Sequence, residues 1–285
     1  MLNQKAFGTE TAPVDHLNDI EFERVCQLLA DEYGLDMSSK RVLLECRLSR
    51  EQERLGLSSF TKYLDLVESN SDPNVRARFI DLVTTHYTYF MRESKQFDFL
   101  RTTVFPELER LRPHRTWNIL CAGCSTGDEC YSVSMVVEDY GQTHRIPHVR
   151  ITGIDVSEPA IAEARVATYP AARVDRVPAR WLTSYFVRKD NTYTVADRVR
   201  KRVSFLSGNL SNPNVLKQTY DLILCRNVII YFNDEARMQA LSTLHRHLAS
   251  SCYLVLGHAE IVRERSMFAY RGHSIYQKQA EATIS

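Results

Sequence analysis

The sequence predicts an α/β protein in which a helical domain precedes a parallel, doubly wound sheet. Two observations support this fold class. From residue 117 onward, short apolar runs alternate with stretches of helical periodicity, which is typical of parallel strands joined by crossover helices. Before about residue 85, apolar residues recur at helical spacing and no run indicates a strand. At 285 residues, the chain is long enough for two unequal domains.

The expected strands of this sheet are the apolar runs at 117–121, 149–155, 203–206, 220–225 and 253–257. Helical patterns lie between them at 129–140, 159–167 and 234–248. Residues 268–277 turn at Arg271 and Gly272, and they are expected to add an antiparallel pair at one edge. Segment 181–202 interrupts the alternation, and its Asp190-Asn191 turn indicates a small antiparallel insertion.

The helical region carries a basic face on its second helix, which is expected from about residue 38 to residue 56. Four basic residues at spacings of seven, three and four share this face: Lys40, Arg47, Arg50 and Arg54. The face is either a solvated helix surface or a docking surface for an acidic partner. A net charge of +1, and no aromatic residues among the basic ones, disfavour nucleic acid as that partner.

The composition, with 44% hydrophobic and 25% charged residues, is that of an ordinary globular protein. No apolar run reaches the ~18 residues that a membrane span requires, so stable membrane insertion is not expected. The amino terminus lacks the apolar core of a secretory signal. Seven unevenly spaced cysteines fit the reduced thiols of a cytosol better than a disulfide frame. We therefore expect a cytoplasmic protein. Cys121, Cys124 and Cys130 lack a second ligand pair, so buried thiols are favoured over a metal site.

The most informative stretch is 117–132, in which an apolar strand, a glycine loop, an acidic pair and a helix follow one another. Gly123 and Gly127 allow the backbone to turn sharply and a ligand to approach closely. Such a unit places a nucleotide-like ligand at the carboxyl end of a parallel sheet. The loop lacks the glycine spacing of dinucleotide folds and the lysine of phosphate loops, and Asp128 and Glu129 would repel a pyrophosphate. S-adenosylmethionine, a phosphate-free nucleoside with a sulfonium cation, therefore fits better than NAD or ATP.

Two further strand ends carry polar residues beside this loop. Asp155 ends the second strand, where a carboxylate can accept hydrogen bonds from ribose hydroxyls, or it only begins a turn. The strand at 220–225 delivers Arg226 and Asn227 to the same crevice. A buried arginine requires a carboxylate or carbonyl partner. Tyr231 is either a core ring or a donor that faces the substrate.

Several runs together resemble the CheR family, the methyltransferases of chemotaxis receptor (MCP) glutamates. They are the loop at 122–129, the run Cys-Arg-Asn-Val-Ile-Ile-Tyr-Phe at 225–232, and the connector at 84–93, with 208–210 and 257–260 in support. The resemblance extends over roughly residues 20–280 in the expected order, which is more specific than any single motif. It implies an N-terminal helical domain at 16–90 and a Rossmann-like class I SAM-dependent methyltransferase domain at 91–285. A small inserted antiparallel β-subdomain is expected at 181–205.

The resemblance also implies roles for individual residues. Arg92 and Tyr231 would lie nearest the transferred methyl group and form the catalytic pair. No metal is implied. The cofactor-binding residues would be His86, Thr88, Arg92, Gly123, Glu129, Asp155, Asn209, Leu210, Asn227 and Val228. The basic second helix, with Lys40, Arg47, Arg50 and Arg54, would dock on the cytoplasmic helical region of a receptor.

The chain departs from the family pattern at a few positions. His86 stands in place of an asparagine, Met91 in place of a phenylalanine, and Cys130 in place of a proline. Ser157 replaces a frequent aspartate, and Ala259 a frequent serine. His86 is the most serious departure, because it sits where cofactor or substrate is usually touched. The short insertion resembles members that do not tether to a receptor tail peptide, and we expect a monomer.

The expected reaction is methyl transfer from S-adenosylmethionine to a receptor glutamate, which yields a glutamate methyl ester and S-adenosylhomocysteine. A glutamate carboxylate, with a pKa near 4.3, is already ionised and requires no general base. The work of the enzyme is then alignment of the reacting atoms and exclusion of water. The alternatives are a related methyltransferase acting on a different protein or a small acid, a non-catalytic SAM-binding module, and an NAD-dependent oxidoreductase.

Overall fold

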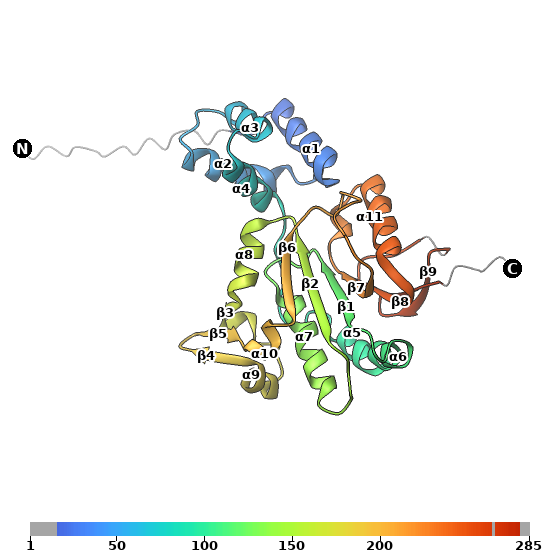
Figure 1. The fold of residues 1–285 in the computed structure, drawn as a ribbon. Helices are drawn as coiled ribbons and strands as arrows, with labels where there is room; N and C mark the ends of the chain where they lie inside the picture. Colours follow the sequence, from blue (N-terminus) through green and yellow to red (C-terminus); the bar gives the residue numbers. More distant parts are fainter. Residues whose placement is uncertain (1–15, 264–265, 280–285) are drawn as a thin grey trace, which may run out of the picture.

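The computed structural model describes residues 16–263 and 266–279. Figure 1 shows a helical domain at the top and an α/β domain with a central sheet below it. This arrangement confirms the predicted fold class. The segment expected to precede the first helix lies outside the described residues. Within the described ranges, no helix combines the length and the apolar character that crossing a bilayer requires.

Within the described residues, the helical domain contains four helices: α1 (Asp19–Tyr33), α2 (Arg41–Arg54), α3 (Phe60–Ser69) and α4 (Pro73–Val83). The first helix starts with a capping box, in which the Asn18 side chain accepts from the Glu21 N–H at 2.9 Å. Fully buried side chains, including Leu29, Leu44 and Phe79, form a core that is separate from that of the sheet domain. The domain is therefore a packed unit of its own.

A connector and three short helical segments lead from the helical domain into the sheet. The segments are α5 (Ser94–Phe99), the π-helical turn η1 (Leu100–Val104) and α6 (Phe105–Leu111). Phe105 stacks on Trp117, the first residue of the central strand, with a centroid distance of 5.8 Å. Residues 84–93, which precede α5, contain no regular element and run past the carboxyl ends of the strands.

In the described part of the chain, the main sheet has seven strands in the order β6-β2-β1-β7-β8-β10-β9. The first five in this order are parallel, and β10 and β9 are antiparallel to their neighbours. The strand bounds are β1 (Trp117–Ala122), β2 (Val149–Asp155), β6 (Val203–Ser207), β7 (Tyr220–Cys225), β8 (Leu248–Leu256), β9 (Phe268–Gly272) and β10 (Ile275–Lys278). All expected strands are present. The strand order reverses between β1 and β7, which opens a crevice at their carboxyl ends.

Three crossover helices pack on this sheet: α7 (Asp128–Gly141), α8 (Glu158–Val166) and α11 (Asp234–His247). The packing of α7 on β2 is close at Gly153, where a Cβ would lie 2.7 Å from the Cys130 sulfur. Cys130, which stands in place of a proline in the family pattern, thus fills space against the sheet. The short turn η3 (Ile229–Tyr231) follows β7.

A second, antiparallel sheet of three strands, in the order β3-β5-β4, is inserted after α8. Its hairpin, β4 (Phe186–Lys189) and β5 (Thr192–Val195), lies within the segment predicted for the small subdomain. The third strand, β3 (Thr168–Pro170), lies before that segment and is too short to show an alternating pattern. The turn η2 (Ala171–Arg173) and the helices α9 (Ala179–Tyr185) and α10 (Asp197–Arg200) complete this region.

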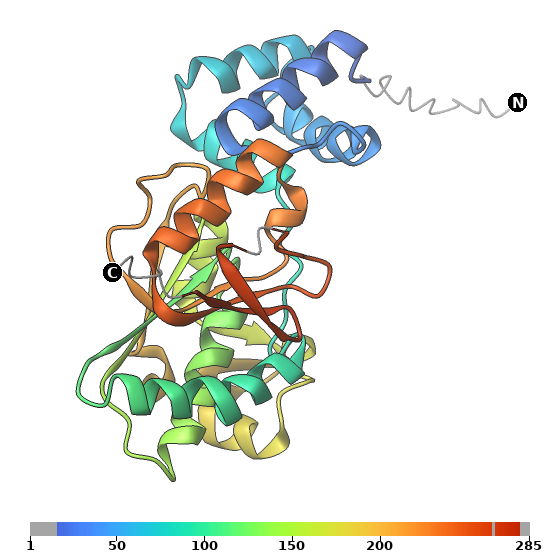
Figure 2. The same ribbon diagram turned by 90° about the vertical axis from the view of Figure 1, so that its right-hand side faces the viewer.

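The helical domain is fastened across the carboxyl ends of the parallel strands. Figure 2 shows α11 running beneath it, and a Cβ on Gly34 would lie 2.2 Å from the Ala236 Cβ in α11. The Gly34 carbonyl accepts a hydrogen bond from Asn233 N at 2.9 Å, and the Tyr231 carbonyl accepts one from Asp36 N at 2.8 Å. The crevice is therefore covered by the helical domain.

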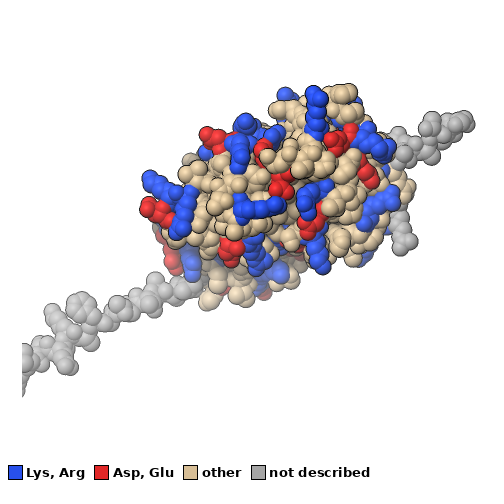
Figure 3. Space-filling view, turned by 90° about the horizontal axis from the view of Figure 1, so that it is seen from below, with Lys and Arg blue, Asp and Glu red and all other residues tan. Residues whose placement is uncertain are grey.

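The opposite end of the molecule is seen in Figure 3, where basic side chains are interspersed with acidic ones. No continuous patch of one sign covers this face among the described residues. This distribution agrees with the net charge of +1. The end of the molecule away from the helical domain thus offers no strong electrostatic attraction to a charged polymer.

Candidate functional site

Two adjoining cavities occupy the crevice between the helical domain and the carboxyl ends of β1, β2 and β7. They share Thr85, Gly123, Ser125 and Asn227. The first is also lined by His86, Asp155, Asn209, Leu210, Val228 and Tyr231. The second is also lined by Thr88, Arg92 and Glu129. The structure thus brings together every residue that the resemblance assigned to the cofactor, although the two predicted catalytic residues line different cavities.

The glycine loop forms the wall between the two cavities. Gly123 has φ +71°, and a Cβ there would lie 2.2 Å from the Val228 Cγ2 atom. Only glycine therefore allows the loop to approach the segment after β7 this closely. Gly127, with φ +87°, caps the start of α7. Ser125 lies between them, and its buried hydroxyl has no hydrogen-bond partner among the described residues.

Asp155 lies at the end of β2 and lines the first cavity. Its Oδ2 accepts a hydrogen bond from Ser125 N at 2.7 Å, and its Oδ1 accepts one from Ser157 N at 3.0 Å. Burial raises the pKa of Asp155, and these backbone N–H groups act in the opposite direction. The carboxylate is thereby held in a fixed orientation with lone pairs that remain available for hydroxyl donors.

Arg226 is the buried cation beneath the second cavity, with a side chain that is 2% exposed. Its Nη1 lies 2.9 Å from Glu129 Oε2, its Nη2 lies 3.4 Å from Glu93 Oε2, and Nη2 also donates to the Arg92 carbonyl. Burial raises the pKa of Glu129, and Arg226 opposes that shift. The expectation that a buried arginine here has carboxylate and carbonyl partners is confirmed. Through these contacts, Arg226 ties the end of β7 to the connector and to α7.

Arg92 lies at the mouth of the second cavity among aromatic rings. Its Nη1 donates to the Tyr87 carbonyl at 2.7 Å, and its guanidinium lies 5.5 Å from the Tyr87 ring and 6.0 Å from the Tyr89 ring. The guanidinium of Arg176, which comes from the inserted region, lies 4.3 Å from the centre of the Tyr89 ring. Within the described ranges, no carboxylate pairs with either arginine. The mouth is therefore cationic and aromatic.

Asn209 has side-chain contacts that the sequence did not indicate, whereas the Tyr231 hydroxyl has none among the described residues. The Asn209 amide donates to the Glu32 carbonyl at 2.6 Å, and its oxygen accepts from Ser211 N at 2.9 Å. Asn209 therefore ties the sheet domain to α1 as well as lining the cavity. Tyr231 is half-buried in the first cavity, and its hydroxyl has no hydrogen-bond partner among the described residues.

Glu260 organises the segment after β7 and was not recognised as a site residue from the sequence. It is 3% exposed, and its carboxylate accepts hydrogen bonds from the backbone N–H groups of Asn227 and Val228, both at 2.8 Å. It also accepts from Gly257 N at 2.6 Å and Ile230 N at 3.3 Å. This contact holds Asn227 at φ +60°. The run at 257–260 was noted in the sequence, but nothing in it indicated this partner.

A second organising contact that the sequence did not indicate lies on the opposite side of the loop. Asp128 is fully buried, and Arg173, from η2, places its Nη2 at 2.6 Å and its Nε at 3.1 Å from the two carboxylate oxygens. The Tyr169 hydroxyl donates to the Thr126 carbonyl at 2.6 Å. The inserted region thus holds the glycine loop through both a side chain and a backbone group.

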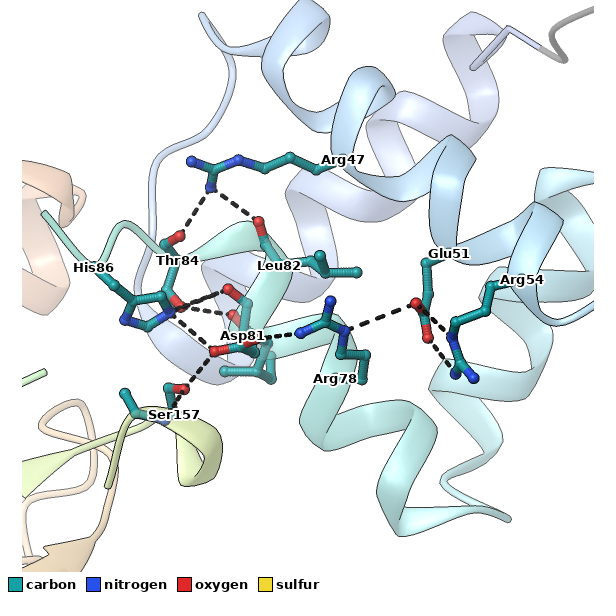
Figure 4. Close-up of polar contacts among 11 residues, drawn as sticks. Arg47, Glu51, Arg54, Arg78, Asp81, Leu82, Thr84, His86 and Ser157 are labelled. Carbon is teal, nitrogen blue, oxygen red and sulfur yellow. Dashed lines mark hydrogen bonds and ion pairs between the residues drawn. The ribbon is translucent and has the colours of Figure 1, made fainter. Parts of the chain in front are cut away.

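The predicted basic docking face is divided by the structure into engaged and free side chains. Arg47 donates to the Leu82 and Thr84 carbonyls at 2.9 and 2.8 Å, which ties α2 to the end of α4 (Figure 4). Arg54 binds Glu51 in a bidentate pair at 2.7 and 2.9 Å. Lys40 and Arg50 are exposed, and neither pairs with a carboxylate in the part of the chain that the structure describes.

The cysteines of the loop region are buried among apolar groups. Burial raises the pKa of Cys121 to about 11, and it raises the pKa values of Cys124 and Cys130 as well. Such thiols pack as small hydrophobic groups rather than reacting as thiolates. Among the described residues, no group of three histidine, cysteine or acidic side chains is placed to hold a metal ion.

The first cavity fits a phosphate-free nucleoside. Among the described residues, the lining of the first cavity includes no lysine or arginine, and Asp155 is positioned there for ribose hydroxyls. A parallel sheet with this loop and this carboxylate defines the class I fold of SAM-dependent methyltransferases. Within that class, residues 86–276 match the model described as CheR methyltransferase, SAM binding domain, and residues 20–84 match the CheR methyltransferase, all-alpha domain. The chain belongs to the CheR methyltransferase family.

Comparison with individual proteins supports the same family. The chain is 31% identical over 265 residues to a chemotaxis protein methyltransferase of Borreliella burgdorferi, an alignment that covers 90% of this chain and 94% of that protein. It is 31% identical to a probable chemotaxis protein methyltransferase of Rhizobium etli, over 79% of this chain and 85% of the relative. It is 29% identical to the chemotaxis protein methyltransferase of Salmonella typhimurium, over 91% of this chain and 90% of the relative.

Proposed function

We propose that this protein methylates glutamate side chains in the cytoplasmic helical region of chemotaxis receptors, yielding glutamate methyl esters and S-adenosylhomocysteine. The observation that carries the proposal is the cationic mouth formed by Arg92 and Arg176 around Tyr89. A mouth without acidic partners suits a substrate that brings its own carboxylate. The names of the relatives, which are chemotaxis protein methyltransferases, support a receptor as the source of that carboxylate.

Bound S-adenosylmethionine would supply an electrophilic methyl group on a sulfonium. In this proposal, the first cavity holds the adenosine part against Asp155, and the second holds the methionine part near Glu129. Arg92 orients the incoming carboxylate by charge and hydrogen bonding. No side chain removes a proton, because the carboxylate is ionised at neutral pH. The remaining task of the site is to align the reacting oxygen with the methyl carbon and to exclude water.

The docking surface is proposed to centre on Lys40 and Arg50, the exposed cations of the predicted basic face that pair with no carboxylate among the described residues. Arg54 adds charge beside them although it binds Glu51, and Arg47 stabilises the face by joining α2 to α4. An acidic helical surface would complement this side of the domain. The short β4–β5 hairpin is the basis for proposing docking without a receptor-tail tether. We also propose that the enzyme acts as a monomer.

The test is a methylation assay with S-adenosylmethionine labelled in the methyl group and a purified cytoplasmic fragment of a chemotaxis receptor. We expect labelled glutamate methyl esters that release methanol in base, and we expect no transfer by the Arg92→Ala variant. Base-stable methylation would instead indicate a different substrate group. Cofactor binding without transfer to any acidic substrate would indicate a non-catalytic module. Transfer to a small acid alone would contradict a receptor substrate.

A further inference from the structure

A polar junction joins the helical domain to the cofactor cavity at the end of α4. Its centre is Asp81, whose carboxylate binds groups from three parts of the chain (Figure 4). Ser157 Oγ, at the start of α8, donates to Asp81 Oδ1 at 2.7 Å. The His86 ring nitrogen Nε2 lies 3.1 Å from the same oxygen, and Arg78 Nη1 donates to Oδ2 at 2.7 Å. Asp81 thus contacts the helical domain, the connector and the sheet domain at once.

The partners of His86 determine which ring nitrogen carries the proton. Nε2 lies 3.1 Å from the Asp81 carbonyl and 3.0 Å from the Thr84 hydroxyl, in addition to the Asp81 carboxylate. The Thr84 hydroxyl donates its own proton to the Ile80 carbonyl at 2.7 Å, so it accepts from His86. Because Nε2 faces only acceptors, it is protonated in both charge states of the ring. The proton that titrates is therefore on Nδ1, which has no protein partner among the described residues.

Charges of both signs surround the His86 ring. Burial alone lowers the pKa of His86, but Asp81 on α4 and Asp155 at the end of β2 outweigh burial, and the pKa is raised. The hydrogen bond from His86 lowers the pKa of Asp81. Arg78 on α4 binds the far oxygen of Asp81, and Arg47 on α2 binds the Thr84 carbonyl. Protonated His86 thus binds Asp81 directly and is also attracted by the charge of Asp155.

The junction reaches the cofactor cavity by two routes. Along one, Asp81 holds the Ser157 side chain, and Ser157 N donates to Asp155 Oδ1 at 3.0 Å. Ser157 is fully buried and also caps α8 by accepting from Ala160 N, so its position is constrained. Along the other route, Asp81 holds His86, which lines the first cavity together with Asp155. One carboxylate of the helical domain therefore orients both neighbours of the predicted ribose-binding group.

We propose that Asp81 is a positioning residue of the cofactor site and that protonation of His86, through this junction, is linked to cofactor binding. The inference rests on the proposed cofactor cavity, but it does not depend on the identity of the methyl acceptor. When His86 is charged, it neutralises the repulsion between Asp81 and Asp155 and keeps the connector against the sheet domain. When His86 loses its proton, Asp81 keeps Arg78 as a charged partner but Asp155 loses its attraction to His86, and the junction loosens. Cofactor affinity should therefore fall as pH rises.

Calorimetric titration of the full chain with S-adenosylhomocysteine tests this linkage, because that ligand carries no sulfonium charge of its own. Between about pH 6 and pH 8.5, we expect Kd to increase by roughly fivefold to tenfold, with the midpoint above the ordinary histidine value of about 6.5. Asp81→Asn should weaken binding at low pH and move the midpoint to lower pH. His86→Asn should remove the pH step, and Ser157→Ala should weaken binding while the step remains.

The matched control is Asp65→Asn, which removes an exposed carboxylate from an ion pair with Arg24 on the same domain, away from the junction. It should bind as the wild type does at every pH. A wild-type affinity that does not change with pH, or a pH step that survives in His86→Asn, would overturn the inference while the proposed function stands. A wild type that does not bind S-adenosylhomocysteine would overturn both. Thermal unfolding of each variant shows whether it is folded. If Asp81→Asn does not fold, the pH dependence of binding by His86→Asn still tests the inference.

Discussion

Two ion pairs of different chemistry hold the glycine loop and the end of β2 at Asp155, one from each side. On the side of the inserted region, Arg173 binds the fully buried Asp128 with two nitrogens. On the side of the helical domain, His86 binds Asp81, whose side chain is 15% exposed. A guanidinium remains charged at all physiological pH values, whereas an imidazole titrates within them. The first contact is therefore a permanent brace, and the second is one that a proton can weaken.

The largest expected effect is at the permanent brace. Arg173→Ala leaves Asp128 buried without its cation, which should lower the free energy of unfolding by about 3–5 kcal/mol. Urea unfolding measures this loss. Arg180→Ala is the matched control, since Arg180 pairs with Asp139 in the same region but is 70% exposed, and removing a surface pair costs about 1 kcal/mol or less. Equal losses in the two variants would show that the buried contact is no stronger than a surface pair.

The second effect concerns the loop that lies between the two contacts. Gly123→Ala combines a positive φ with a Cβ that would lie 2.2 Å from Val228 Cγ2, so we expect a loss of about 2–4 kcal/mol in stability and a large loss of cofactor affinity. Gly56→Ala is the control, because Gly56 has φ +65° and no atom within 4 Å of an added Cβ. It isolates the backbone strain of about 1–2 kcal/mol. A similar cost in both variants would exclude the steric contribution of Val228.

A smaller effect is expected at the substrate mouth, to which the inserted region contributes Arg176. Arg176→Ala should raise the KM for the receptor fragment by about tenfold, or about 1.4 kcal/mol, because a cation that meets the substrate carboxylate is removed. The affinity for S-adenosylhomocysteine should not change, since Arg176 lines neither cavity. Steady-state kinetics and calorimetry on the same preparation separate the two. A parallel loss of cofactor affinity would assign Arg176 to loop support instead.

The smallest effect is the pH dependence of stability at the titratable contact. The pKa of His86 is raised in the folded state, so its contribution is fully present below the unfolded value of about 6.5 and is lost as pH rises through the folded pKa. Urea unfolding measured below about pH 6.5 and above the folded pKa of His86 should show a lower free energy of unfolding at the higher pH. His86→Asn should remove this difference, and Arg173→Ala should leave it intact. A difference that persists without His86 would place the titration elsewhere.

The secondary structure and the glycine loop could be predicted because their signals lie within neighbouring residues. The capping box at Asn18, the apolar strands and the glycines at 123 and 127 each follow from local patterns. The missed strand β3 has three residues, which is too few for a period of two to be recognised. The placement of Asp155 and Asn227 beside the loop was expected, because parallel strands bring their carboxyl ends to one edge.

Other site features could not be predicted from local patterns. Glu260 is 33 residues from Asn227, and Arg173 is 45 residues from Asp128. Their contacts require that the loops after β8 and α8 fold back onto the crevice. The basic face illustrates the same point, because its spacing was visible in the sequence but the engagement of Arg47 by α4 was not. A charge pattern shows which residues share a face and leaves open which of them remain free.

By itself, the sequence determined the order of the main-sheet strands and their crossover helices, the phosphate-free loop and the family, since all three are recorded in the types and spacing of nearby residues. Only the tertiary structure decided which charges meet. Arg226 meets Glu129 across 97 residues of sequence, and Asp81 meets Ser157 across 76. The physical reason is that a buried charge is stable only beside a partner, and the fold, not the spacing along the chain, determines which partner is within reach.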